Sequence, residues 1–270
     1  MPNENLNENE IKAIFSLLQS EPDHKEQLIK RLSEFYNKNP RRVYNLALEY
    51  FGVLPSELIK IFKENQNYLQ ADINKYLNLK NPSLLEGLIL LAKIINSKSK
   101  KEEILELFNL AREEFDKVMD SSFEIIQKAQ VLQIFFFKTL GFKLETSTIQ
   151  TNYLNLPEVF KNFKTTPLFM AVLYLIFIYP YEVKADIFEA ENKIIVRLRD
   201  AFSLEPVYID IAQKGYFIGE EDCDIYAAGN FIKWDSKNII PLTKNTIFKI
   251  LLKTLTKTSK EYNFLSVYLN

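Results

Sequence analysis

The sequence is short of the residues from which most enzyme sites are built. Its 270 residues include one cysteine, Cys223, and one histidine, His24. A single cysteine excludes an internal disulfide and favours a reducing compartment, so we expect a cytoplasmic protein. Because no pair of carboxylates at i,i+4 spacing accompanies either residue, we expect no metal site.

Glycine and net charge are also scarce. The six glycines form neither a Walker loop nor a dinucleotide-binding loop, so we expect no cofactor of those classes. The formal net charge of −1 lacks the basic excess that nucleic-acid-binding proteins carry, and nucleic acid is not an expected partner. The first ten residues, MPNENLNENE, have neither the basic nor the apolar region of a signal peptide.

One apolar run dominates the chain, but it is too short for a membrane span, which needs about 20 residues. The run extends over 168–179 and ends at Pro180. Thr166 is suited to cap a helix and Pro167 to occupy its first turn. A short helix that is apolar on all sides belongs in a protein core. We therefore expect four of its side chains to be deeply buried: Phe169, Val172, Leu173 and Ile176.

The pattern on either side of this helix predicts an α+β fold. Residues 1–80 read as short helices with Pro-marked turns, which favours either a helical-repeat array or a single bundle. Further helices follow Asn81-Pro82-Ser83. After Pro180 the apolar period changes from 3.6 to 2, which predicts an antiparallel sheet over 183–218. We expect a helical domain at 1–80 and an α+β domain at 81–270.

Six blocks of this chain, taken in order, resemble the transglutaminase-like superfamily. They are LLEGLILLAKII (84–95), IFFFKTLGF (134–142), NYLNLPEVF (152–160), TTPLFMAVLYL (165–175), VYIDI with KG (207–215) and EEDC (220–223). The similarity covers roughly residues 82–260 and is specifically to the bacterial branch named after the invasion regulator SirB. Some members of that branch carry a helical-repeat prefix, which residues 1–80 resemble. The resemblance implies a papain-like core in which a central helix packs on an antiparallel sheet.

The same resemblance implies where catalytic residues would lie. Active members use a Cys at the start of the central helix, a His on the second strand and an Asp on the third. This chain has Thr165 and Thr166 at the helix start, and Asn192 or Lys193 at the His position, and only Asp210 is retained. We therefore expect a pseudoenzyme that acts as an interaction or regulatory scaffold, with another protein as its partner.

Two alternatives remain open. In the first, a residual hydrolase or acyltransferase uses Thr165 as nucleophile, Lys193 as base and Asp210 as the third group. In the second, the last helix docks on an anionic surface or nucleic acid through a basic stripe at i, i+4, i+8 and i+11. That stripe consists of Lys249, Lys253, Lys257 and Lys260.

The only histidine and the only cysteine are poor candidates for catalysis. His24 follows Asp23 at a predicted helix start and is expected to be a surface residue. Cys223 follows three acidic residues, and that setting raises the pKa of a thiol rather than lowering it.

Overall fold

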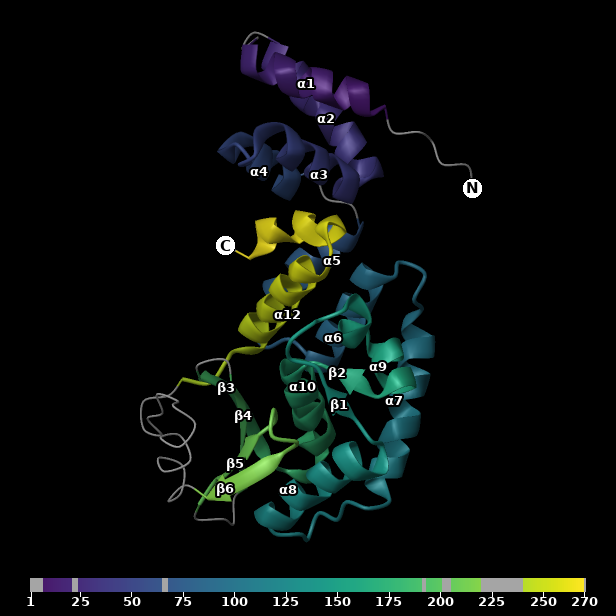
Figure 1. Cartoon of the computed structure of the whole chain (residues 1–270), viewed down its shortest axis with the longest axis vertical. Helices are drawn as coiled ribbons and strands as arrows, with labels where there is room; N and C mark the ends of the chain where they lie inside the picture. Colours follow the sequence, from purple (N-terminus) through teal and green to yellow (C-terminus); the bar gives the residue numbers. More distant parts are fainter. Residues whose placement is uncertain are drawn as a thin grey trace. The chain divides into compact units, whose positions relative to one another are not determined.

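The structure, a computed structural model, describes residues 7–20, 24–64, 68–190, 193–200, 205–219 and 240–269. The chain divides into two compact units, drawn in Figure 1. The first comprises Met1–Leu79 together with Leu252–Asn270, and the second comprises Lys80–Leu251. The predicted domains, 1–80 and 81–270, differ from this division over the last stretch of the chain. An apolar period shows that a helix face is buried, but it does not show which element covers that face.

The first unit is helical throughout its described residues. Its helices are α1 (Glu8–Ser20), α2 (Lys25–Lys38), α3 (Pro40–Phe51), α4 (Ser56–Glu64) and α5 (Tyr68–Leu77). The end of α12 (Lys244–Thr258) and the 3-10 segment η5 (Lys260–Tyr268) complete it, and η5 packs against α3 and α4. Asn39 is the N-cap of α3, because its side chain accepts a hydrogen bond from the Arg42 amide at 3.1 Å.

The core of this first unit combines aliphatic side chains with packed aromatic rings. The Tyr36 ring stacks on Phe62 with 4.5 Å between ring centroids, and the Gln70 side chain donates a hydrogen bond of 2.8 Å to the Tyr36 hydroxyl. Burial raises the pKa of Tyr36 well above its ordinary value. The hydroxyls of Tyr44 and Ser266 are hydrogen bonded to each other, which ties the C-terminal segment to α3.

The second unit is built around α10. Its helices are α6 (Leu84–Ile95), α7 (Lys101–Asp116), α8 (Ile125–Gln133), α9 (Leu156–Asn162) and α10 (Pro167–Ile178), and α12 begins in it. A π-helical segment, η2 (Ile134–Thr139), extends α8, and two 3-10 segments, η3 (Thr151–Leu154) and η4 (Tyr179–Tyr181), flank α9 and α10. Figure 1 shows α10 between the sheet on one side and α6, α7 and α9 on the other.

The sheet of the second unit is antiparallel. Among the described residues it contains four strands in the order β3 (Lys184–Ala190), β4 (Lys193–Arg199), β5 (Val207–Asp210) and β6 (Tyr216–Gly219). Ile187 lies opposite Val196, and Val196 lies opposite Ile209. Helix α10 packs on β3 and β4, whereas α8 packs on β4 and β5. The predicted α+β fold, with a central helix on an antiparallel sheet, is confirmed.

Three of the four predicted core positions on α10 are fully buried, namely Phe169, Val172 and Leu173. The prediction for Ile176 is wrong, because Ile176 is half-buried and, with Leu175, lines a cavity. The sequence also gave no signal for the short parallel pair of β1 (Lys143–Leu144) and β2 (Lys164–Thr165). Two-residue strands are too short to show a period.

Candidate functional site

The start of α10 holds the two threonines that the sequence offered as nucleophiles. Thr166 is the N-cap of α10, and its side-chain oxygen accepts a hydrogen bond from the Phe169 amide at 3.4 Å. Pro167 occupies the first turn, where its missing N–H costs nothing. The hydroxyl of Thr166 is therefore engaged in capping the helix.

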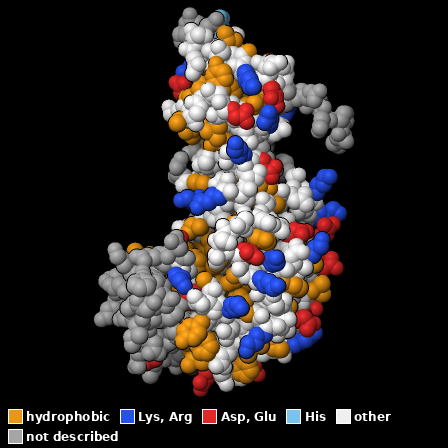
Figure 2. Space-filling model, in the orientation of Figure 1, with side chains coloured by type: hydrophobic (Ala, Val, Ile, Leu, Met, Phe, Trp, Pro, Cys, Tyr) orange, Lys and Arg blue, Asp and Glu red, His pale blue; other side chains and the backbone are white. Residues whose placement is uncertain are grey.

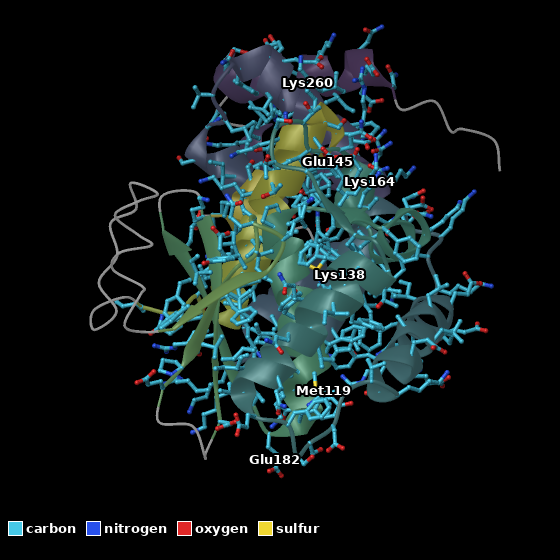
Figure 3. All side chains as sticks on the ribbon, turned by 60° about the horizontal axis from the view of Figure 1, so that its bottom comes forward. Met119, Lys138, Glu145, Lys164, Glu182 and Lys260 are labelled. Carbon is cyan, nitrogen blue, oxygen red and sulfur yellow. The ribbon has the colours of Figure 1, made fainter. Side chains whose placement is uncertain are left out.

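Thr165 is buried and hydrogen bonded to the backbone. It lies on β2 opposite Leu144 of β1, and its exposed fraction is 0%. Its hydroxyl donates a hydrogen bond of 2.8 Å to the carbonyl oxygen of Tyr153 in η3. Figure 3 labels Glu145 and Lys164, which mark the places where β1 and β2 lie. The hydrogen-bond donor of Thr165 is thus directed at η3.

Lys193 and Asp210 lie on neighbouring strands and form an ion pair. The Lys193 Nζ atom lies 3.2 Å from Asp210 Oδ2, and the exposed fractions of the two side chains are 23% and 1%. The other carboxylate oxygen, Oδ1, accepts a hydrogen bond of 3.2 Å from the Gln213 amide. An ammonium group in such a pair is a hydrogen-bond donor only. It has no lone pair with which to take a proton from a nucleophile.

The turn that follows Asp210 is held tightly against α10. The Gly215 amide donates to the Asp210 carbonyl at 3.1 Å, and Gly215 has a positive φ of 74°. A Cβ atom there would lie 2.9 Å from the Tyr174 hydroxyl and 3.2 Å from Gln133. Only glycine therefore fits this position without displacing its neighbours. The sequence offered one signal, the pair Lys214-Gly215 directly before the strand that begins at Tyr216.

The hydroxyl of Tyr174 is a polar group that sequence reasoning missed. It is buried and has no hydrogen-bond partner among the residues that the structure describes. Its ring stacks on Phe136 with 5.3 Å between centroids, and burial raises the pKa of Tyr174 well above its ordinary value. The side chain of Tyr174 therefore serves mainly as a packing surface for the turn that carries Gly215.

The structure brings together two of the three residues proposed for a residual enzyme. Lys193 and Asp210 are paired, whereas the hydrogen bond of Thr165 goes to Tyr153. Asn192, the other candidate for the His position, lies outside the described residues, as does Cys223. Within the described parts of the chain, no cluster of three or more His, Cys, Asp or Glu side chains could hold a metal ion.

The remaining candidates lie elsewhere. His24 precedes α2 in the first unit, is exposed, and makes no side-chain cap. Three lysines of the basic stripe lie on α12: Lys249 is half-buried, and Lys253 and Lys257 are exposed. Helix α12 ends at Thr258, so Lys260, labelled in Figure 3, belongs to η5 instead. The i+11 spacing of that stripe therefore does not continue along one α-helix.

Charge on the visible face of the second unit is mixed, since Lys and Arg side chains alternate with Asp and Glu in Figure 2. None of the described helices combines the length and the apolar character that crossing a bilayer requires.

No curated protein sequence and no solved structure matches the chain. The family described as the transglutaminase-like superfamily matches residues 99–253, which is more than half of the chain and includes α10, Lys193 and Asp210. The chain therefore belongs to the transglutaminase-like superfamily.

Proposed function

We propose that this protein is a non-catalytic member of the superfamily, in the branch named after the invasion regulator SirB. In this proposal it works in the cytoplasm as an interaction or regulatory scaffold, and its partner is another protein. The observation that carries the proposal is the state of the two threonines at the start of α10. Thr165 donates to a backbone carbonyl and Thr166 caps the helix, so neither hydroxyl is available as a nucleophile.

The pair on the sheet supports the same proposal. Active members place an imidazole on the second strand and a carboxylate on the third, where Lys193 of β4 and Asp210 of β5 meet in this chain. An imidazole oriented by a carboxylate can take a proton from a nucleophile. An ammonium paired with a buried carboxylate instead links two strands. In this proposal the Lys193–Asp210 pair has a structural role, because it links β4 to β5.

A residual enzyme would have to break this arrangement first. Thr165 could attack a substrate only after its hydroxyl left the Tyr153 carbonyl, and a buried carbonyl left without a donor costs about 1–3 kcal/mol. Lys193 would have to give up a proton while it neutralises Asp210. Both costs precede any chemistry and weigh against this alternative.

Turnover measurements on the full-length protein test the proposal. We expect no ester hydrolysis, amide hydrolysis or amine transfer above the rate without protein, for the wild type and for variants at both candidate positions. The informative variants are Thr165→Val, which replaces the hydroxyl with a methyl group of similar size, and Lys193→Met. Turnover that disappears in both variants, with the circular dichroism spectrum unchanged, would establish the residual enzyme instead.

Two further substitutions serve as controls for thiol and imidazole chemistry. Cys223→Ala and His24→Ala should leave any measured activity unchanged, because neither residue occupies the Cys or His position of the superfamily pattern in this sequence. A reaction that depends on Cys223 or His24 would also contradict the proposal. It would point to an enzyme that uses neither Thr165 nor Lys193.

A further inference from the structure

Two adjoining cavities of 590 and 280 Å³ lie in the second unit, at the C-terminal end of α10. We call them together the α10 groove. Six residues line both cavities: Asn81, Pro82, Leu175, Ala185, Asp186 and Lys244. The larger cavity is within the range of about 300–1,000 Å³ that is typical of ligand pockets. Its lining comes from the start of α6, the end of α10, β3 and the start of α12.

One wall of the α10 groove is apolar. Leu84 and Leu85 of α6 face it together with Leu175 and Ile176 of α10, and all four side chains are half-buried. The rest of α10 is almost entirely buried. Beyond Pro167 in its first turn, this highly apolar helix therefore leaves two side chains accessible, and both line the groove. Apolar surface of this kind favours a ligand that covers it.

The second wall is the outer edge of β3, which is paired at Ile187 but not at Ala185 among the described residues. The carbonyl oxygen of Ile187 on β3 accepts a hydrogen bond of 2.8 Å from the Leu242 amide. Because hydrogen-bonding direction alternates along a strand, the N–H and C=O groups of Ala185 point to the same edge. The chain leaves this edge where α12 begins at Lys244. Among the described residues, nothing pairs with the outward backbone groups of Ala185.

The rim of the α10 groove is basic. Lys184, Arg199 and Lys244 line the larger cavity, and Asp186 is the acidic residue among its lining. Asp186 already accepts hydrogen bonds from Arg197 at 2.7 Å and Arg199 at 2.8 Å. Neither Lys184 nor Lys244 forms an ion pair with a carboxylate of the described residues, and Lys244 donates to the Asn81 side chain at 2.8 Å.

We propose that the α10 groove binds an extended acidic peptide segment of a partner protein, which adds a strand to the edge of β3 beside Ala185. The peptide backbone would pair with Ala185, its apolar side chains would contact Leu175 and Ile176, and its carboxylates would face Lys184 and Lys244. Strand addition of this kind draws affinity from main-chain hydrogen bonds and specificity from alternate side chains. The proposal rests on the scaffold function proposed above and names the chemistry of the partner.

Lys184, on the edge strand β3, is the reason to expect an acidic peptide and not a basic or uncharged one. Lysine at a sheet edge discourages pairing with uncharged strands, because its ammonium would lose water without gaining a partner. An acidic strand supplies that partner. Complementary charge also speeds association and suppresses wrong partners.

Binding of three synthetic peptides to the full-length protein tests the inference. The probes are acetyl-Val-Glu-Val-Glu-Val-amide, the same peptide with lysine in place of glutamate, and the glutamate peptide with N-methylated backbone amides. We expect the acidic peptide to bind about tenfold more tightly than the lysine peptide, and the N-methylated peptide to bind at least about tenfold more weakly. Amide NMR shifts should map the contact to β3.

Variants of the protein complete the test. Ala185→Pro removes the outward N–H at an edge position where proline is tolerated, and should weaken binding about tenfold. The double variant Lys184→Glu with Lys244→Glu should reverse the preference between acidic and basic peptides. The matched control is Lys138→Glu, an exposed lysine of η2 that does not line the groove and is labelled in Figure 3; it should leave binding unchanged.

Each contrary result overturns the inference. Equal binding of the N-methylated peptide would indicate an anion pocket rather than strand addition, and equal binding of the lysine peptide would exclude charge selection. Absence of binding by all three peptides would exclude the groove as a peptide site. These outcomes are independent of the turnover assays, which decide whether the protein is non-catalytic.

Discussion

At its N-terminal end, α10 begins beside two threonine hydroxyls that are both engaged in hydrogen bonds, whereas at its C-terminal end it borders an accessible groove. Thr165 and Thr166 are hydrogen bonded inside the protein, and Lys193 is paired with Asp210. At the other end, Leu175 and Ile176 are half-buried beside the open edge of β3. The superfamily resemblance directs attention to the first end, because active members carry their nucleophile there.

The comparison shows how a fold can keep its architecture while its accessible chemistry lies elsewhere. A catalytic end needs a group that is exposed, oriented and free to react. The N-terminal end of α10 has groups of roughly the right kind, but their hydrogen bonds now hold β2, η3 and the helix start in place. The C-terminal end has accessible apolar surface, backbone groups and positive charge, which are the ingredients of a binding site.

The largest expected effect is a difference in unfolding free energy between substitutions at the two ends of α10. Phe169→Ala, at the fully buried end, should lower the free energy of unfolding by about 3–5 kcal/mol, because it leaves a cavity in the core. Ile176→Ala, at the groove, should cost only about 1–2 kcal/mol, since half-exposed atoms lose less on truncation. Urea denaturation of both variants measures the difference. Equal losses would mean that the groove is closed in solution.

The order of these two effects could not be predicted from the sequence. Phe169 and Ile176 lie on a helix with apolar residues on every side, so periodicity gives no face that is less buried than another. The helix itself was predictable, because its cap at Thr166, its first-turn Pro167 and its stop near Pro180 are local signals. The exposure of Ile176 depends on where β3 and α12 begin in space, and tertiary packing decides that.

The same distinction applies to the candidate site. The resemblance placed Lys193 and Asp210 at corresponding strand positions, and the structure pairs them. It did not reveal the acceptor for Thr165, because the Tyr153 carbonyl belongs to the 3-10 segment η3, which packs directly against β2 in the folded chain. Backbone acceptors leave no mark on residue identity, so the sequence could not show that this hydroxyl is engaged.

A second prediction concerns the buried half of the second unit, where the turn after Asp210 meets α10. Gly215→Ala should cost about 2–4 kcal/mol, because a side chain at positive φ is strained by about 1–2 kcal/mol and its Cβ collides with Tyr174. Gly141→Ala is the matched control, with a φ of 70° and nothing within 4 Å of an added Cβ, and should show the strain alone. Equal destabilisation would mean that the turn is not packed on α10.

A third prediction concerns the polar contacts at the C-terminal end of α10. Arg112 donates to the Phe177 carbonyl at 2.8 Å and pairs with Asp116 at 2.8 Å, so its guanidinium satisfies the end of the helix. Arg112→Gln should cost about 1.5–3 kcal/mol, as expected for a charged hydrogen bond. Arg112→Lys should lie between, because an ammonium lacks the planar fork. A loss below about 0.5 kcal/mol in both variants would contradict this role.

The smallest expected effect is a titration at the same end of α10. The pKa of Tyr181 is raised to about 12, first by burial and then by its hydrogen bond of 2.6 Å to Asp116 and by the negative charge of that carboxylate. Since the folded pKa exceeds the unfolded value of about 10, the neutral phenol contributes stability that is fully present below about pH 10 and is lost as the pH rises through about 12.

Asp116→Asn removes the charge and should lower the pKa of Tyr181 toward its ordinary value, whereas Arg112→Gln removes an opposing charge and should raise it. NMR titration of carbon-labelled tyrosine, with Tyr181→Phe to assign the resonance, measures both shifts. A Tyr181 pKa that stays near 12 in Asp116→Asn would show that burial alone sets it, and the hydrogen bond that joins η4 to α7 would then have no energetic role.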